Sequence, residues 1–187
     1  MSLAEYSFRL HAFRKEATFR LDEEALTVAD PKGETVYPLR DIASIRLAYA
    51  PSRIRTRRYT MTIRLRDRRK LVLSNEHYAG PADFESRSEA YLAFVGALHR
   101  QLLALAVPVR YRAGSTPAGF SGTALVVISA LIGLPLIGAF LVRGNGSFAT
   151  MIGWAVVFAL LPVLFVMIWR NWPRKYDPAR IPSVVLP

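Results

Sequence analysis

Two apolar stretches without a charged residue dominate the last third of the chain. They cover residues 120–142 and 148–169, and only residues 143–147 separate them. Each would reach about 33 Å as a helix, enough to cross a bilayer core of about 30 Å. Because the short linker allows no more than a tight turn, the sequence predicts a two-helix transmembrane hairpin.

The cations on either side of this predicted hairpin indicate its orientation. Several Lys and Arg residues precede and follow it, whereas the linker carries Arg143 alone. Since cationic flanks favour the cytoplasmic side, we expect a multi-pass protein of the bacterial inner membrane with both termini in the cytoplasm. The first residues are too charged for an export leader. Trp169, Trp172 and Tyr176 are expected at the membrane interface, where amphipathic aromatic side chains are favoured.

Small residues recur at a four-residue spacing within the two stretches. They form the pairs Ser129 with Gly133 and Ala149 with Gly153. Such spacing lets helix backbones approach closely, so these four are the predicted helix-packing positions, although small residues are also common in apolar helices generally. Neither stretch holds an ionisable residue, which argues against an ion or proton pathway.

The chain as a whole is strongly basic, with a formal net charge of +11. Such a balance indicates either nucleic acid or anionic lipid as a partner. The sequence has no zinc-finger spacing, helix-turn-helix or RNA-binding aromatic motif. We therefore expect anionic membrane lipids and a membrane protein complex as partners, and no nucleic acid. The absence of cysteine fits a cytosolic domain without disulfides.

The first part of the chain shows the alternation of apolar and polar residues that is typical of half-buried strands. The predicted strands lie near residues 6–10, 17–21, 24–29, 34–39, 43–49, 59–65 and 69–73. Between two of them, Asp30 to Gly33 predicts a turn, because proline fixes one dihedral and glycine permits positive φ.

A helical period follows the strands. Apolar residues recur at three- and four-residue steps from Tyr91 to Leu105, and Pro108 ends the pattern. Ser86 and Glu89 have the spacing of a capping box, which predicts the helix start. The predicted fold class is α+β, a small β-barrel capped by a C-terminal helix and followed by the transmembrane hairpin. The predicted divisions are a cytosolic domain (1–107), a linker (108–119), the hairpin (120–169) and a cytosolic tail (170–187).

This order of strands and helix resembles the pleckstrin-homology-like fold. The residues that carry the pattern are Phe19, Leu21, Leu26, Leu39, Ile42 and Ile45, leading into a helix at 86–106. More narrowly, the chain is similar to bacterial membrane proteins that join such a domain to transmembrane helices, with the domain here preceding the hairpin. The resemblance implies that a basic loop between strands binds phosphate headgroups.

Arginine residues are densest in the connection between two predicted strands. The candidate lipid- or partner-binding residues are Arg53, Arg55, Arg57 and Arg58. Guanidinium groups offer planar paired donors to phosphate and stay charged at accessible pH. Three interpretations stay open: a patch that faces anionic lipid, a contact with a protein partner, and a solvated polar turn.

No arrangement of residues in the sequence indicates an enzyme. The three histidines, His11, His77 and His99, are too far apart for a local metal motif, and no nucleotide-binding or nucleophile motif occurs. A divalent-metal site is a minor alternative, because one predicted loop gathers Glu76, His77, Asp83 and Glu85. We therefore expect no catalytic residues, no metal and no cofactor.

The C-terminal tail combines four prolines with large apolar side chains. Those of residues 172–187 include Trp172, Tyr176, Ile181 and Val184 to Leu186. Segments that proline holds extended bind with a small loss of entropy. We therefore predict that the tail is ordered, with the N-terminal domain as its binding surface.

These observations favour a non-catalytic, membrane-anchored adaptor or accessory subunit. Its cytosolic domain would bind anionic lipid headgroups or a protein partner. The alternative is a component of a membrane enzyme or transporter whose function lies in the cytosolic domain.

Overall fold

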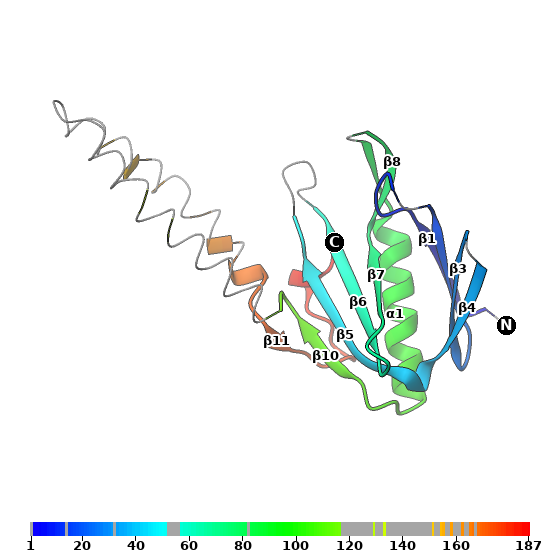
Figure 1. The fold of residues 1–187 in the computed structure, drawn as a ribbon. Helices are drawn as coiled ribbons and strands as arrows, with labels where there is room; N and C mark the ends of the chain where they lie inside the picture. Colours follow the sequence, from blue (N-terminus) through cyan, green and yellow to red (C-terminus); the bar gives the residue numbers. More distant parts are fainter. Residues whose placement is uncertain are drawn as a thin grey trace. The chain divides into compact units, whose positions relative to one another are not determined.

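A computed structural model describes residues 2–13, 15–31, 33–51, 57–81, 83–116 and 168–187, together with positions 129, 133, 151, 154, 155, 158, 162, 165 and 166. The chain divides into two compact units. The first joins Met1–Gly114 to Arg174–Pro187, and the second is Ser115–Pro173. The strands and the long helix α1 named below belong to the first unit (Figure 1).

A four-stranded antiparallel sheet opens the first unit, with its strands in sequence order. The strands are β1 (Ala4–Phe8), β2 (Ala17–Leu21), β3 (Ala25–Asp30) and β4 (Gly33–Pro38). Alternate residues such as Tyr6, Phe8, Phe19 and Leu21 are buried, as the period of two requires. The turn between β3 and β4 uses Gly33 at φ 137°, a conformation that residues with a Cβ rarely adopt.

A second sheet of five strands follows, in the order β11-β10-β5-β6-β7. A short helix η1 (Leu39–Asp41) leads into β5 (Ile42–Tyr49), β6 (Tyr59–Leu65) and β7 (Lys70–Ser74). The turn between β6 and β7 is held by Asp67, whose Oδ1 accepts a hydrogen bond from the Arg69 amide at 2.9 Å. On the inner side of this sheet, Ile45, Leu47, Met61, Ile63 and Leu73 are buried.

The two strands at one edge of this sheet, β11 and β10, lie far apart in the sequence. Strand β10 (Arg110–Ala113) runs parallel to β5, and β11 (Arg174–Lys175) runs antiparallel to β10. Residues 110–113 fall where a linker is predicted, so a four-residue strand replaces part of that linker. Beyond β11, the helix η2 (Ser183–Val185) contacts β5.

A hairpin and a helix complete the first unit. The hairpin consists of β8 (Glu76–Gly80) and β9 (Asp83–Ser86), and the Tyr78 amide donates to the Arg9 carbonyl at 2.8 Å. The helix α1 (Ser88–Ala104) is seen between β7 and the four-stranded sheet in the view of Figure 1. Its apolar stripe, which includes Tyr91, Phe94 and Leu98, is buried in the same core as the two sheets.

The start of α1 differs from the capping-box prediction. Arg87 is the N-cap residue, and no side chain caps the helix. The Ser86 hydroxyl instead lies 2.9 Å from the Ser88 hydroxyl. Ser86 ends β9, so its hydroxyl lies outside the first helical turn and cannot act as the predicted cap.

The tail prediction is confirmed for the residues from 174 onward. These residues belong to the first compact unit and add β11 to its sheet. Val185 is fully buried in the core, and Tyr176, Ile181 and Leu186 pack against that core. Each side chain buried in this way stabilises the fold by roughly 1.5–3 kcal/mol before ordering costs.

The predicted barrel is wrong. The described strands form three separate sheets, and none of these closes on itself. In the part of the chain that the structure describes, β4 pairs with β3 alone and β7 pairs with β6 alone. Two open sheets that pack with α1 therefore replace the closed barrel.

The predicted transmembrane hairpin is also corrected. Among the described residues, no helix is long and apolar enough to cross a membrane. This finding contradicts the hairpin, the membrane class and the multi-pass location in a bacterial inner membrane that the apolar stretches predicted. Most of residues 120–169 lie outside the described residues.

Candidate anion-binding surface

The outward face of the five-stranded sheet carries two rows of cations. The register places Lys175, Arg112 and Arg46 side by side on β11, β10 and β5. In the neighbouring row, Arg110 lies opposite Ser44 on β5, which pairs with Arg64 on β6, which pairs with Lys70 on β7. We call these six residues the basic face: Arg46, Arg64, Lys70, Arg110, Arg112 and Lys175.

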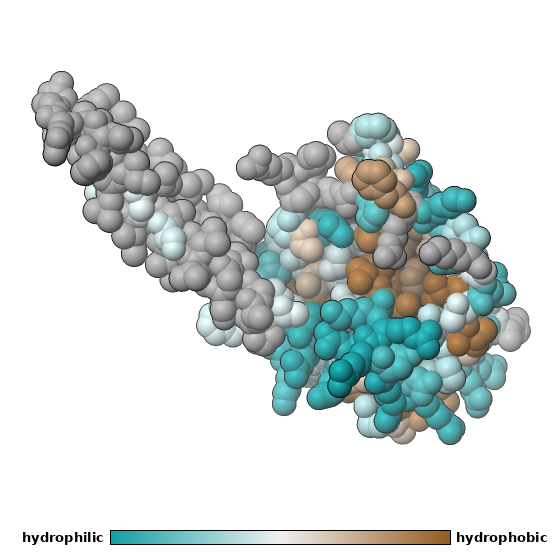
Figure 2. Space-filling view, in the orientation of Figure 1, coloured by the Kyte–Doolittle hydropathy of each residue, from teal (hydrophilic) through white to brown (hydrophobic). Residues whose placement is uncertain are grey.

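The basic face follows from the side-chain alternation of the strands. Ile45, Leu47 and Ile63 are fully buried on the inner side of the sheet, so the residues between them point outward. Cross-strand partners share one side of a sheet, which brings cations from different strands together. Figure 2 shows hydrophilic side chains gathered over this part of the sheet.

The spacing of strands and residues makes the basic face broad. Neighbouring strands lie about 4.8 Å apart, and residues two apart along a strand are about 7 Å apart. The six cations therefore spread over about 19 Å across five strands and about 7 Å along them. None of the five strands contains Asp or Glu, so no carboxylate within these strands neutralises the cations.

Arg46 is a half-buried member of the basic face. Burial lowers the pKa of its guanidinium, and the nearby charges of Arg112 and Arg64 lower the pKa further. Its Nη1 donates to the Gly114 carbonyl at 3.2 Å, which fixes the side chain. The guanidinium keeps its charge at accessible pH, so the three arginines repel one another.

Of the four arginines in the predicted loop, the structure describes only the last two, Arg57 and Arg58. Arg53 and Arg55 lie outside the described residues. Arg57 is exposed and Arg58 is half-buried. The backbone there is anchored, because Asn75 Nδ2 donates to the Arg57 carbonyl at 3.1 Å and the Ala50 amide donates to the Arg58 carbonyl at 2.9 Å.

The predicted interface aromatics fall in different units. Trp169 and Trp172 are both 55% exposed and belong to the second unit. Tyr176 belongs to the first unit, where it packs against the core and its hydroxyl lies 2.8 Å from His99 Nε2. Because His99 Nδ1 lies 2.7 Å from the Val95 carbonyl, Nδ1 donates there and Nε2 accepts from Tyr176.

The predicted helix-packing residues belong to the second unit. Ser129 is exposed and Gly133 is half-buried, while Ala149 and Gly153 lie outside the described residues. Large apolar side chains of this unit are exposed, among them Met151, Trp154, Phe158, Phe165 and Val166. Exposed apolar side chains in such numbers are typical of a contact surface.

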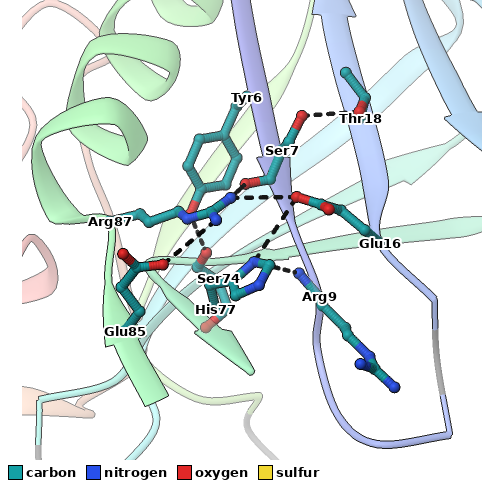
Figure 3. A network of polar contacts seen from close by, with 9 residues as sticks. All are labelled: Tyr6, Ser7, Arg9, Glu16, Thr18, Ser74, His77, Glu85 and Arg87. Atoms are coloured by element: carbon teal, nitrogen blue, oxygen red, sulfur yellow. Dashed lines mark hydrogen bonds and ion pairs between the residues drawn. The ribbon is translucent and has the colours of Figure 1, made fainter. Parts of the chain in front are cut away.

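The loop proposed as a divalent-metal site instead forms a network of protein contacts (Figure 3). Arg87 donates to Glu16 at 3.3 Å and to Glu85 at 3.4 Å. His77 Nδ1 accepts from the Arg9 amide at 3.2 Å. No group of three or more potential metal ligands occurs in the described ranges. These contacts join β1, β2 and the β8–β9 hairpin, which is a structural role.

Sequence reasoning missed most of the basic face. Arg46 and Arg64 lie at outward positions of strands that the sequence predicts, so the sequence could have shown that their side chains point away from the core. Arg112 and Lys175 reach the same face through β10 and β11, and a strand of four or two residues is too short to show a period.

Comparison with known proteins adds no family to these observations. No model of a protein family matches the chain, and no curated protein matches it either. The resemblance to bacterial membrane proteins with a pleckstrin-homology-like domain therefore stays a prediction.

Proposed function

We propose that this chain is a non-catalytic accessory or adaptor protein whose basic face binds the phosphate groups of anionic lipids. One observation carries the proposal: six cations lie in two adjacent rows on one sheet face, and the five strands that present them hold no carboxylate. Near an anionic lipid surface each such cation contributes about 1 kcal/mol of attraction.

The side chains between the cations favour lipid phosphate over other anionic partners. The outward positions hold small or aliphatic residues such as Ser44, Ala48, Thr62 and Val72. Aromatic side chains anchor most protein interfaces and stack the bases of single-stranded nucleic acid. No outward position of β5, β6, β7, β10 or β11 holds an aromatic residue. A layer of phosphates needs charge alone, which this face supplies.

Vesicle binding tests the proposal. We expect the full-length chain to bind vesicles of phosphatidylcholine mixed with phosphatidylglycerol, and to bind pure phosphatidylcholine weakly. The triple variant Arg64→Gln, Arg110→Gln, Arg112→Gln should lose more than tenfold in affinity at about 1 kcal/mol per cation. Added salt should reproduce the loss, because the attraction is screened.

A matched variant controls for net charge. The triple variant Arg20→Gln, Arg100→Gln, Arg180→Gln also removes three positive charges, but from positions outside the basic face. We expect this control to keep most of the affinity for anionic vesicles. Equal losses in the two variants would contradict the proposal, since net charge alone would then explain binding.

An acidic protein is the second candidate partner, and the exposed apolar residues of the second unit favour it. Polyglutamate in place of vesicles tests this candidate. Binding of polyglutamate to the basic face, with no binding of anionic vesicles, would replace lipid by an acidic protein. The further alternative, a component of an enzyme or transporter, predicts a catalytic or transport defect in the Gln triple variant.

A further inference from the structure

A cleft lined by both apolar side chains and polar groups lies between the first sheet and the edge of the second. Its volume is about 160 Å³. One wall is the inner side of the four-stranded sheet, with Phe8, Phe19 and Val28, and the other is β7, with Leu71 and Val72. Figure 2 shows hydrophobic side chains at the surface between β7 and the four-stranded sheet. The cleft is too small for most small-molecule sites, which span about 300–1,000 Å³, but it accommodates one or two side chains.

The hydrogen-bond pattern shows which backbone groups of β7 point into this region. The Leu65 amide donates to the Arg69 carbonyl, and the Asn75 amide donates to the Tyr59 carbonyl. Pairs in an antiparallel ladder alternate, so the odd-numbered residues of β7 bond to β6. The amides and carbonyls of Lys70 and Val72 therefore point away from β6.

These outward groups are open to a ligand. Within the described residues, neither Lys70 nor Val72 has a partner on the outer side of β7. The outward carbonyl of Ser74, in contrast, accepts a hydrogen bond from the Tyr6 hydroxyl at 2.6 Å. Two residues at strand spacing, each with an unpaired donor and acceptor, match the backbone of one added strand.

Charge at the rim of the cleft indicates the composition of that strand. Lys15 and Lys70 are both exposed there and face one carboxylate, Asp30. The surplus of cations favours acidic residues in the ligand. The chain's own tail is already paired at the opposite edge of the sheet, through β11. Among the residues that the structure describes, no segment pairs with the outer side of β7, and we take the occupant to be a segment of another protein.

We propose that the edge of β7 binds an extended peptide from a partner protein. The peptide pairs with the backbone of Lys70 and Val72, places an apolar side chain in the cleft, and sets an acidic residue beside Lys15 or Lys70. This site goes beyond the proposed lipid binding, because it uses the backbone at the edge of the sheet, although it shares Lys70 with the basic face.

Selection from a phage-displayed library of random heptapeptides, with the full-length chain as target, tests this proposal. We expect the enriched peptides to alternate apolar and polar residues and to carry Asp or Glu. The best enriched sequence, labelled with fluorescein, then serves as the probe in fluorescence polarisation. A selection that enriches no such peptide would overturn the proposal.

Two proline variants locate the binding edge. Val72→Pro removes the outward amide of β7 without touching a bond to β6, since proline is tolerated at the open edge of a sheet. We expect it to weaken probe binding at least tenfold. Val36→Pro is the matched control, because Val36 is an exposed residue at the open edge of β4. The control should stay within about twofold of the unchanged chain. A loss in Val36→Pro with none in Val72→Pro would overturn the proposal.

Amide hydrogen exchange on the unchanged chain gives a second readout that needs no variant. Bound probe should slow exchange at Lys70 and Val72, and leave exchange at Val36 unaltered. Lys15→Gln and Lys70→Gln should each lower the affinity for the probe about two- to fivefold, which is the contribution of one exposed ion pair. Unaltered exchange at both β7 amides under saturating probe would contradict strand addition.

Discussion

The two edges of the five-stranded sheet differ in how they end. At one edge, β10 and β11 extend the sheet, and the tail that carries β11 then places Val185 in the core with no exposed surface. At the other edge, β7 stays open and Val72 is 37% exposed. The chain's own tail thus covers one edge and contributes to the stability of the fold, whereas the other edge is open to a partner.

The largest effect should come from placing a charge at each edge. Val185→Asp buries an unpaired carboxylate, and we expect the free energy of unfolding to fall by about 3 kcal/mol or more. The same change at the open edge, Val72→Asp, should cost less than about 1 kcal/mol because the side chain reaches water. Urea denaturation of both variants measures the difference. Similar costs at the two edges would contradict the comparison.

A smaller effect is expected from one hydroxyl at the closed edge. Tyr176→Phe removes the donor to His99 Nε2 and leaves a buried acceptor unpaired, which should cost about 1–2 kcal/mol. Tyr78→Phe, on the β8–β9 hairpin, is the matched change outside this contact and should cost less. Thermal unfolding compares the two. A more stable Tyr176→Phe would show that the hydroxyl contributes nothing to docking.

The closed edge should also respond to pH. Burial lowers the pKa of His99, and its bond to the Val95 carbonyl opposes this in part. The unfolded chain takes up a proton near pH 6.5, which the folded chain resists, so stability should fall as the pH drops below about 6.5. Urea denaturation between pH 8 and pH 5 should show a shallower fall in His99→Gln than in His11→Gln, which serves as the control. Equal slopes in the two variants would contradict this role of His99.

The smallest effect concerns the backbone beside each edge. Arg68 in the turn before β7 and Ala106 before β10 adopt φ values of 70° and 49°, in the left-handed region. Glycine relieves this strain but loses more entropy on folding, so Arg68→Gly and Ala106→Gly should each stabilise the fold by about 0.5 kcal/mol. Arg66→Gly is the control. A loss of stability in both glycine variants would show that side-chain contacts outweigh the strain.

Local periodicity predicted β1 to β7 and the helix α1, whereas β8, β9, β10 and β11 were not predicted. Buried residues such as Phe19, Leu26 and Ile63 fall at the alternate positions of the predicted strands, and α1 covers most of the predicted helix. Alternation within a strand depends on neighbours in sequence, which is why it can be read without the structure. From residue 174 onward the tail prediction succeeded for a similar reason, because apolar residues such as Ile181 and Val185 favour burial, whereas Trp172 is 55% exposed.

Pairing between distant segments could not be predicted. Strand β10 joins β5 across more than sixty residues, and β11 joins β10 across a comparable distance. Nothing in Arg110 to Ala113 indicates either partner. The basic face depends on both pairings, so the sequence pointed to the arginine loop at 53–58 instead. The hairpin prediction rested on length and hydropathy alone, and the described residues contradict it.

The position of Val185 has a consequence for the order of synthesis. The core around Ile45, Leu47 and Met61 includes a side chain that the ribosome adds only after the whole of the second unit. During translation, the first unit therefore lacks Val185 in its core and β11 beside β10 until the last residues are added. Exposed edges of this kind promote aggregation of nascent chains. A stop codon that removes the last few residues would leave a domain unable to finish its own core, although all of its described strands, through β11, would already be present.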